Sequence, residues 1–220
     1  AELSYKFKKG TLLGGEKGTL IALNFSRINS IDKQAIDSLT AIGRRGTDGY
    51  KSGFFDIGDE LFYQDFNVEL NKKINNLKIN LSYVNLLYNY DVIKGMTGHG
   101  KIYSNIGIAD IAWNFAPKHS IRFETQALFS EQDMKNWLTG MIEYSIAPKW
   151  FFSISDQYNY GNPNDNLKIH YYSAAIAFAH HSTRMQIGYG KQREGVVCAG
   201  GVCRNVPASN GFTLTLTSSF

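Results

Sequence analysis

The sequence lacks long apolar runs and has few cysteines, and both shortages exclude classes of protein. No segment approaches the roughly 20 consecutive apolar residues that a transmembrane helix requires, which excludes a helical membrane protein. Only two cysteines occur among 220 residues. Neither a histidine nor an acidic residue follows them at ligand spacing, so a metal or redox centre built on cysteine is disfavoured.

The chain also lacks a concentrated charge of either sign. Charged residues make up 19% of the sequence, the formal net charge is +4, and the basic residues are scattered. A nucleic-acid-binding protein usually carries a basic patch, so we expect no nucleic-acid partner. No signal peptide is visible, because Ala1 opens directly onto an alternation of polar and apolar residues. We therefore expect either a mature protein or a piece of one.

Aromatic residues and glycine are abundant. The 13 tyrosines and 14 phenylalanines accompany 21 glycines and only four prolines, a mixture that favours strands joined by turns. Strict alternation of apolar and polar residues, typical of strands with unlike faces, recurs along the chain. It covers residues 3–8, 21–26, 65–71, 77–83, 109–115, 121–130, 138–146, 150–157, 171–178, 184–190 and 212–219. This pattern predicts about eleven strands. The one helical candidate is a short segment at 33–42.

Alternation alone fits two folds. In a soluble β-sandwich the apolar face points to a shared core, whereas in an outer-membrane barrel it meets lipid. The connections favour the barrel, because tight ones alternate with longer ones as in an up-and-down meander. The tight connections are 74–76, 116–120, 147–149 and 180–183, and the longer ones are 29–59, 93–101, 131–136, 161–166 and 193–209. The segment 9–17 is an exception, because this connection is long although it falls at the end of the sheet where the others are tight.

Strand length and aromatic placement support the same fold. Counted from one connection to the next, most predicted strands run about nine to twelve residues, enough to cross a membrane at a tilt and longer than the usual soluble strand. Aromatic residues gather near predicted strand ends, which is typical of the interfacial girdles of barrels. They are Tyr88, Tyr90, Trp113, Phe115, Trp150, Phe152, Tyr158 and Tyr160. We predict an all-β, antiparallel, up-and-down transmembrane β-barrel in the bacterial outer membrane.

Eleven is an unusual strand count, because bacterial single-chain barrels normally have an even number. One interpretation is that residues 1–220 form a single barrel region, the C-terminal part of a larger barrel whose first strands are missing. The alternative is a miscount, with an extra pairing in FFDIG at 54–58.

Two segments carry a family resemblance. GTLLGGEKGTLIALNFSRINSIDK at 10–33 and VVCAGGVCRNVPASNGFTLTLTSSF at 196–220 resemble an uncharacterised outer-membrane barrel family of Bacteroidota. The resemblance covers the two ends of the chain well, whereas the middle shares only the general alternating pattern of the family. It implies the fold, the compartment and a truncated barrel, but it implies no activity and no catalytic residue.

The two cysteines lie in CAGGVC, where two glycines allow a tight reversal. In an oxidising envelope a pair this close indicates a structural disulfide, here between Cys198 and Cys203. The last strand, GFTLTLTSSF, ends on an aromatic residue. Its lipid-facing residues resemble the C-terminal signal that barrel-assembly machinery recognises, and they are Phe212, Leu214, Leu216 and Phe220.

Candidates for catalysis or metal binding are weak. Ser209 in S-N-G suggests a rim hydrolase only if His99 supplies its base from afar, and Asp91 with His99 is a poor protease pair. His180 and His181 would point to opposite faces of a strand and fall in a predicted turn. GNPNDN at 161–166 is rich in oxygen but lacks the pattern of a calcium loop. We expect no enzyme, no metal and no cofactor.

The polar face is predicted to line the barrel interior. Its charged residues have both signs, which fits either a wet channel or a salt-bridged plug. They are Asp65, Glu69, Lys78, Asp110, Arg122, Glu124, Glu143 and Arg184. We therefore expect a non-enzymatic channel, or a scaffold whose extracellular loops at 29–59 and 193–209 engage envelope or surface proteins. An outer-membrane hydrolase and a soluble β-sandwich remain the alternatives.

Overall fold

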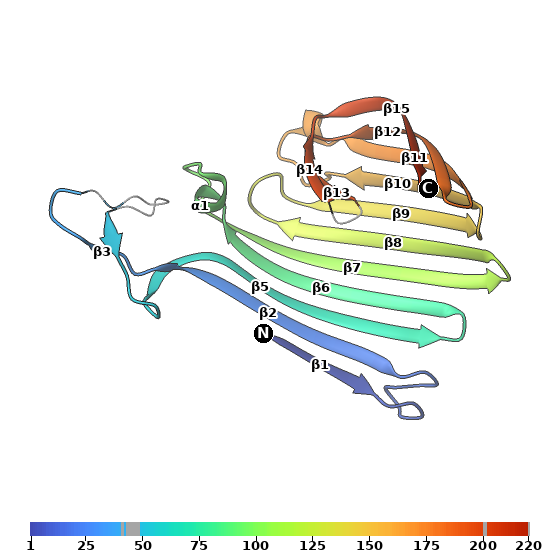
Figure 1. The fold of residues 1–220 in the computed structure, drawn as a ribbon, viewed down its shortest axis with the longest axis horizontal. Coiled ribbons are helices and arrows are strands. Elements are labelled where there is room, and N and C mark those ends of the chain that lie inside the picture. The colour runs from blue at the N-terminus through green and yellow to red at the C-terminus, as the bar shows by residue number, and fades with distance from the viewer. Residues whose placement is uncertain (41, 43–48, 200–201, 220) are drawn as a thin grey trace.

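The computed structural model describes residues 1–40, 42, 49–199 and 202–219, with backbone alone at 196–199 and 202–206. It contains an antiparallel sheet of eleven strands (Figure 1). In sheet order these are β1 (Glu2–Phe7), β2 (Thr19–Ile31), β5 (Ile57–Ile74), β6 (Leu77–Asn89), β7 (Lys101–Ala116), β8 (His119–Ser130), β9 (Trp137–Ile146), β10 (Trp150–Tyr158), β11 (His170–His180), β12 (Thr183–Gln192) and β15 (Ser209–Ser218). The predicted all-β meander of eleven strands is confirmed.

The remaining elements are short. They are β3 (Gln34–Ala35) with β4 (Tyr50–Lys51), β13 (Gly195–Ala199) with β14 (Val202–Val206), the helix α1 (Tyr90–Lys94) and a 3₁₀ turn at Asp165–Leu167. The suggested helix at 33–42 is wrong. There the carboxylate of Asp37 accepts hydrogen bonds from the backbone N–H groups of Leu39 and Thr40, a local turn that competes with a helix.

The helix α1 was not predicted, and capping residues define it. The side chain of Asn89 accepts a hydrogen bond from the N–H of Val92, and Gly95 follows in the left-handed conformation at φ 70°. The segment FFDIG contributes no extra strand, because only its last two residues belong to β5.

Tight turns close one end of the sheet. They join β5 to β6, β7 to β8, β9 to β10 and β11 to β12, with Asn75, Lys118 and His181 at positive φ. We call this the turn end. The opposite, loop end carries the connections that contain β3–β4, α1 and β13–β14. The predicted alternation of short and long connections is confirmed, and so is the long segment between β1 and β2 at the turn end.

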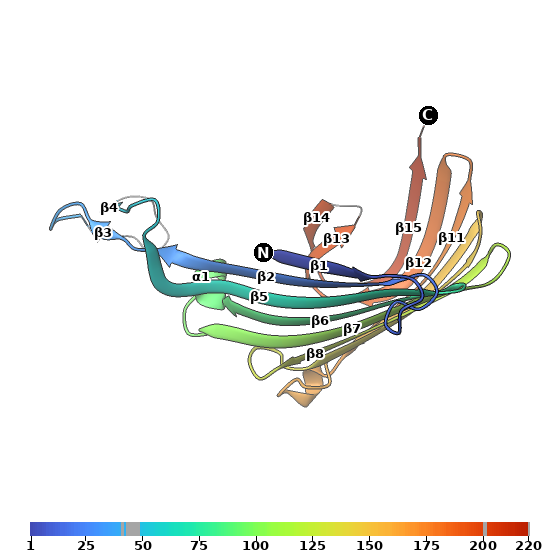
Figure 2. The same cartoon turned by 90° about the horizontal axis from the view of Figure 1, so that it is seen from below.

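The sheet is curved and open (Figure 2). β1 and β15 lie at its two edges and do not pair with each other. Following the chain direction through the antiparallel pairs, both edge strands run toward the turn end. Direct pairing of the two edges would therefore be parallel. The structure shows the antiparallel sheet of the predicted barrel, but not its closure.

The two faces of the sheet differ in polarity. One face carries the aliphatic and aromatic side chains, which stay exposed: Ile154 by 57%, Ile176 by 51% and Ile187 by 50%. Among the described residues, the buried hydrophobic ones are only Ala22, Ile102 and Ala177. The other face carries the charged and amide side chains. It is the concave face, because the β13–β14 hairpin lies inside the curve of the sheet and Arg193 at its base lies over Trp137 (Figure 2).

The convex face changes character near the loop end. There Asn85 and Asn105 occupy the positions that apolar residues hold further along β6 and β7, and both Asn85 and the hydroxyl of Tyr83 donate to the Oδ1 atom of Asn105. On the concave side of the same two strands, apolar residues appear instead, and Ile102 is 4% exposed. On β6 and β7 the apolar row of the convex face is therefore interrupted before the strands end.

Aromatic rings border the apolar belt of the convex face at both ends. Near the turn end, rings within 4.8 to 6.3 Å of one another connect neighbouring strands, namely Trp113, Phe115, Tyr144, Phe152, Trp150 and Phe178. Toward the loop end, Tyr189 lies 6.4 Å from Tyr172 and 4.8 Å from Phe212. The prediction of aromatic residues near strand ends holds for the turn end, where Trp113, Phe115, Trp150 and Phe152 belong to this row. Of the residues predicted for the loop end, Tyr158 ends β10, Tyr88 lines a cavity of the concave face, and Tyr90 and Tyr160 lie outside the strands.

Candidate functional site

A charged cluster occupies the middle of the concave face, and Arg122 is its centre. The Nε atom of Arg122 lies 2.8 Å from Oδ1 of Asp110, and its Nη1 atom lies 2.8 Å from Oε2 of Glu143. Its Nη2 atom donates to Glu124. Register explains the convergence, because Glu143 lies directly opposite Arg122, Glu124 is two residues further along β8, and Asp110 lies opposite Glu124.

Amide side chains surround these charges. Asn80 donates to Asp110 at 3.4 Å, and Asn67 on β5 donates to Glu69 at 3.3 Å. The cluster is electrostatically unbalanced, since one guanidinium contacts three carboxylates. Arg184, on the same face, lies over the ring of Phe151 at 5.2 Å and donates to Gln186. A cavity of about 310 Å³ separates Arg122 from Arg184.

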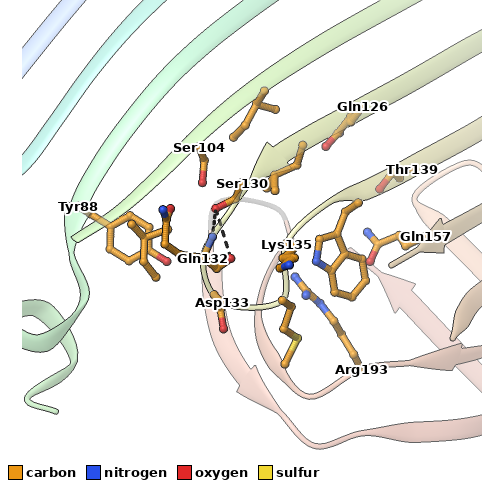
Figure 3. Close-up of a pocket in the computed structure, with 15 residues that line it drawn as sticks. Tyr88, Ser104, Gln126, Ser130, Gln132, Asp133, Lys135, Thr139, Gln157 and Arg193 are labelled. Carbon is orange, nitrogen blue, oxygen red and sulfur yellow. Dashed lines mark hydrogen bonds between the residues drawn. The ribbon is translucent and has the colours of Figure 1, made fainter. Parts of the chain in front are cut away.

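A second cavity lies on the concave face at the loop end, with a volume of about 270 Å³. We call it the loop-end pocket; Figure 3 shows its side chains. Its floor comes from β6 to β10, and its rim comes from the 131–136 connection and Arg193. Its lining consists of Tyr88, Ile102, Ser104, Ile106, Gln126, Leu128, Ser130, Gln132, Asp133, Met134, Lys135, Trp137, Thr139, Gln157 and Arg193.

Two features of this pocket were not predicted. The guanidinium of Arg193 lies 4.6 Å from the ring centroid of Trp137, although 55 residues separate them in the sequence. The 131–136 connection also carries Asp133 and Lys135 at positive φ. The residue types alone gave no signal, because the pairing of Arg193 with Trp137 depends on the path of the β12–β15 connection.

A polar pair on the convex face was also not predicted. His170 Nδ1 lies 2.6 Å from Asp156 Oδ2, and the imidazole stacks on Tyr158 with ring centroids 4.1 Å apart. The three residues lie at the loop-end limit of the apolar belt. The alternation of β10 and β11 contains the signal, since Asp156 and His170 occupy positions with the parity of Ile154 and Tyr172.

The candidate hydrolase residues do not form a catalytic constellation in the described residues. His99 and Asp91 are close, with Nδ1 of His99 3.5 Å from Oδ1 of Asp91. However, the carboxylate of Asp91 accepts the backbone N–H groups of Gly98, His99 and Gly100, each at 3.1 Å. Ser209 begins β15 opposite Gln192, and no described contact joins it to His99.

These hydrogen bonds also set the acidity of Asp91. Partial desolvation acts to raise its pKa, but the bonds from Gly100, His99 and Gly98, together with the nearby imidazole of His99, outweigh it and hold the pKa below its ordinary value. Asp91 therefore stays ionised at neutral pH and orders its own loop.

The other candidate ligands are engaged locally. In the 161–166 segment, Asn162 and Asn164 each accept a backbone N–H two residues on, and Asp165 pairs with Lys168 at 2.7 Å. These contacts describe a turn. The rings of His180 and His181 lie 4.2 Å apart in the β11–β12 turn. Among the described residues, no group of three or more His, Cys, Asp or Glu side chains is placed to hold a metal ion.

The structure describes the residues of the predicted disulfide and of the predicted assembly signal only in part. Cys198 on β13 lies directly opposite Cys203 on β14, but both side chains lie outside the described residues. Phe212, Leu214 and Leu216 share the convex face of the edge strand β15 and are 82%, 71% and 68% exposed. Phe220 lies outside the described residues.

The fold and the concave face define an all-β protein, an eleven-stranded antiparallel sheet with one apolar and one polar, charge-bearing face. The chain belongs to the Family of unknown function (DUF6029), which it matches over residues 1–220. Neither the curated proteins nor the solved structures contain a significant match. Within the described residues, no helix is long and apolar enough to cross a membrane.

Proposed function

We propose that this sheet is the wall of an outer-membrane β-barrel and that its concave face lines a water-filled channel. The observation that carries the proposal is the sorting of side chains over eleven strands, with apolar residues on the convex face and charged or amide residues on the concave face. Transmembrane barrels have an apolar outer band, flanking aromatic girdles and a polar interior.

The dimensions of the apolar belt support this proposal. On β10 the convex row from the ring of Trp150 to the ring of Tyr158 spans about eight residue steps, or roughly 27 Å of strand. Its charged residue, Asp156, lies near the loop end and pairs with His170. A tilt near 40° reduces this length to about 20 Å, close to the apolar band of outer-membrane barrels, about 25 Å tall.

A soluble β-sandwich is less well supported. A sandwich buries its apolar face against a second sheet, about 10 Å away. In the part of the chain that the structure describes, the other sheets have two strands each, at β3–β4 and β13–β14. Soluble monomers rarely expose continuous apolar patches larger than a few hundred Å². The apolar belt across eleven strands has the chemistry of a lipid contact.

The direction of the edge strands limits how the proposed barrel can close. Because β1 and β15 run the same way, an all-antiparallel barrel needs an odd number of further strands between them. The two edges otherwise leave unpaired N–H and C=O groups, which a membrane does not tolerate. We propose that the exposed row of Phe212, Leu214 and Leu216, with Phe220, is the segment that the barrel-assembly machinery engages.

The β13–β14 hairpin is proposed to carry a disulfide at the loop end. Directly opposite residues of an antiparallel pair have Cα atoms about 4.5 to 5.5 Å apart, within the roughly 4.4–6.8 Å range that a disulfide spans. The register of Cys198 and Cys203 meets this condition. An oxidising envelope would then favour the bond.

A second candidate function is a scaffold for envelope or surface proteins. It is favoured by exposed apolar side chains on the β2–β5 connection, where Leu39, Phe54 and Phe55 are 93%, 95% and 85% exposed. A photo-crosslinking residue at position 54 tests it in intact cells. An adduct with an envelope protein would support the scaffold, and the absence of any protein adduct would count against it.

The channel proposal is tested by membrane extraction followed by reconstitution. We expect the protein to resist alkaline extraction from the outer-membrane fraction and, after purification in detergent, to give discrete conductance steps in planar bilayers. Recovery of the folded protein in the soluble fraction without detergent would contradict the membrane assignment. Stable insertion without conductance would support the membrane assignment but refute the open channel.

A further inference from the structure

The loop-end pocket is held in shape by its rim. Asn136 accepts two hydrogen bonds. Its side-chain Oδ1 atom accepts one from the backbone N–H of Ser130 at 3.0 Å, and its backbone carbonyl oxygen accepts one from the backbone N–H of Gly161 at 3.1 Å. Gly161 approaches so closely that a side chain there would collide with the backbone of Asn136. The side chain of Gln132 also accepts the N–H of Tyr103 at 3.1 Å. The 131–136 connection is therefore fixed to three neighbouring segments.

Three polar side chains of the pocket make no hydrogen bond or ion pair with the described residues. Thr139 and Gln157 line it from β9 and β10, and Lys135 lines it from the rim. In the part of the chain that the structure describes, the side chains of these three residues make no hydrogen bond or ion pair. An amide, a hydroxyl and an ammonium group that converge on one cavity offer several donors and acceptors to a ligand.

The pocket continues into a neighbouring cavity of about 350 Å³, which shares Gln157 and Arg193. In this second cavity Lys191 lies over the ring of Tyr171 at 5.8 Å, and that ring lies 6.1 Å from Trp137. Arg193 and Lys191 are thus neighbouring cations, each held over an aromatic ring. Neither forms an ion pair among the described residues.

The charge of this double cavity is positive on balance. Lys135, Lys191 and Arg193 face two acidic residues, Asp133 and Glu194. A guanidinium that is positioned by an aromatic ring and has no carboxylate partner is suited to bidentate recognition of a carboxylate. The amide and hydroxyl groups beside it suit the hydroxyls of a sugar, and the rings of Trp137 and Tyr171 suit its C–H faces.

We infer that the double cavity binds an acidic saccharide, a sugar of one or two rings that bears a carboxylate. Arg193 and Lys191 would bind the carboxylate, Gln157 and Thr139 would bind ring hydroxyls, and Trp137 would contact the ring carbons. The binding site follows from the cavity itself. Its role as the solute site of a channel mouth rests on the proposed function.

Titration calorimetry on the full chain in detergent tests the inference, with digalacturonate as the probe. Digalactose tests the need for the carboxylate, and acetate tests the need for the sugar. We expect digalacturonate to bind at least about tenfold more tightly than either, because a charge-assisted hydrogen bond and the hydroxyl contacts act together. Equal binding of digalactose, or no binding of digalacturonate, would overturn the inference.

Matched variants locate the site. Arg193→Gln is expected to weaken digalacturonate binding about tenfold by removing the charge-assisted bonds. Arg184→Gln changes an arginine on the same concave face, outside both cavities, and is expected to leave binding unchanged. Equal losses in the two variants would refute the assignment of the site. A difference in gel mobility between heated and unheated samples confirms that both variants are folded.

The binding result and the channel result are independent. Conductance without digalacturonate binding would overturn this inference and leave the channel intact. Binding without conductance would support the saccharide site and refute the channel.

Discussion

Arg122 shows how a single residue organises the concave face. It contacts carboxylates on three neighbouring strands, β7, β8 and β9, so it joins them by side chains as well as by backbone hydrogen bonds. Its side chain is 38% exposed, which places the cluster at a wet surface rather than in a dry core. Water screens each ion pair there, and the value of the cluster lies in keeping three like charges from repelling one another.

We predict that Arg122→Met destabilises the folded protein by about 1–2 kcal/mol, because Asp110, Glu124 and Glu143 then lie close together without a cation. Arg184→Met, on the same face without a carboxylate contact, is the control and should cost less than half as much. Urea unfolding of the refolded protein in detergent measures both. Added salt should reduce the loss in Arg122→Met, since it screens the repulsion. Equal losses in the two variants would contradict the account of the cluster.

Asp91 gives a pH-dependent prediction. Its pKa is lowered in the folded protein, so its contribution to loop order is present above the ordinary carboxyl pKa of about 3.9 and is lost as the pH falls through the lower, folded value. We expect an NMR titration of the Asp91 carboxyl carbon to give a midpoint below that ordinary value. Asp91→Asn should speed amide exchange at Gly98, His99 and Gly100 at neutral pH. A midpoint at or above 3.9 would show that the three hydrogen bonds do not form.

At the scale of single elements, the β13–β14 hairpin makes the predicted disulfide testable. We expect alkylation of the denatured, unreduced protein to leave Cys198 and Cys203 unmodified, and prior reduction to add two alkyl groups by mass spectrometry. The bond closes a small loop, so its loss should cost at the low end of roughly 2–4 kcal/mol. Two alkyl groups on the unreduced protein isolated from the oxidising envelope would contradict the disulfide.

The strands were predictable from sequence because their signal is local. Period two appears in every strand of the large sheet, and tight turns such as Lys118 and His181 separate them. Helix α1 was missed because five residues are too few for a helical period, and its cap depends on Asn89, which is 5% exposed. The helix predicted at 33–42 does not form, because the side chain of Asp37 accepts backbone N–H groups there and stabilises a turn.

The sequence predicted which residues of the candidate site share a face, but not which of them are in contact. Alternation assigned Asp110, Arg122, Glu124 and Glu143 to one face, but it does not tell which residues are neighbours across strands. That depends on register, which places Arg122 opposite both Ala112 and Glu143. The contact of Arg193 with Trp137 is less predictable still, because a long connection brings the two together.

In the proposed function, the whole molecule is a boundary between two solvents, water and lipid. Its convex face is mainly apolar between two rows of aromatic rings, and its concave face carries most of the charges and amides and both cavities of the proposed saccharide site. A folded protein with only three buried hydrophobic residues in its described part has little conventional core. In a membrane, lipid on the convex face would take the place of that core.

Site-by-site solvent accessibility along β12 tests this central claim most directly. Single cysteines at Arg184, Met185, Gln186 and Ile187, in a background with Cys198→Ser and Cys203→Ser, are compared in lipid vesicles. The account predicts period two, with positions 184 and 186 accessible to a water-soluble paramagnetic quencher and positions 185 and 187 accessible to a lipid-soluble one. Equal accessibility of all four positions to the water-soluble quencher would contradict it.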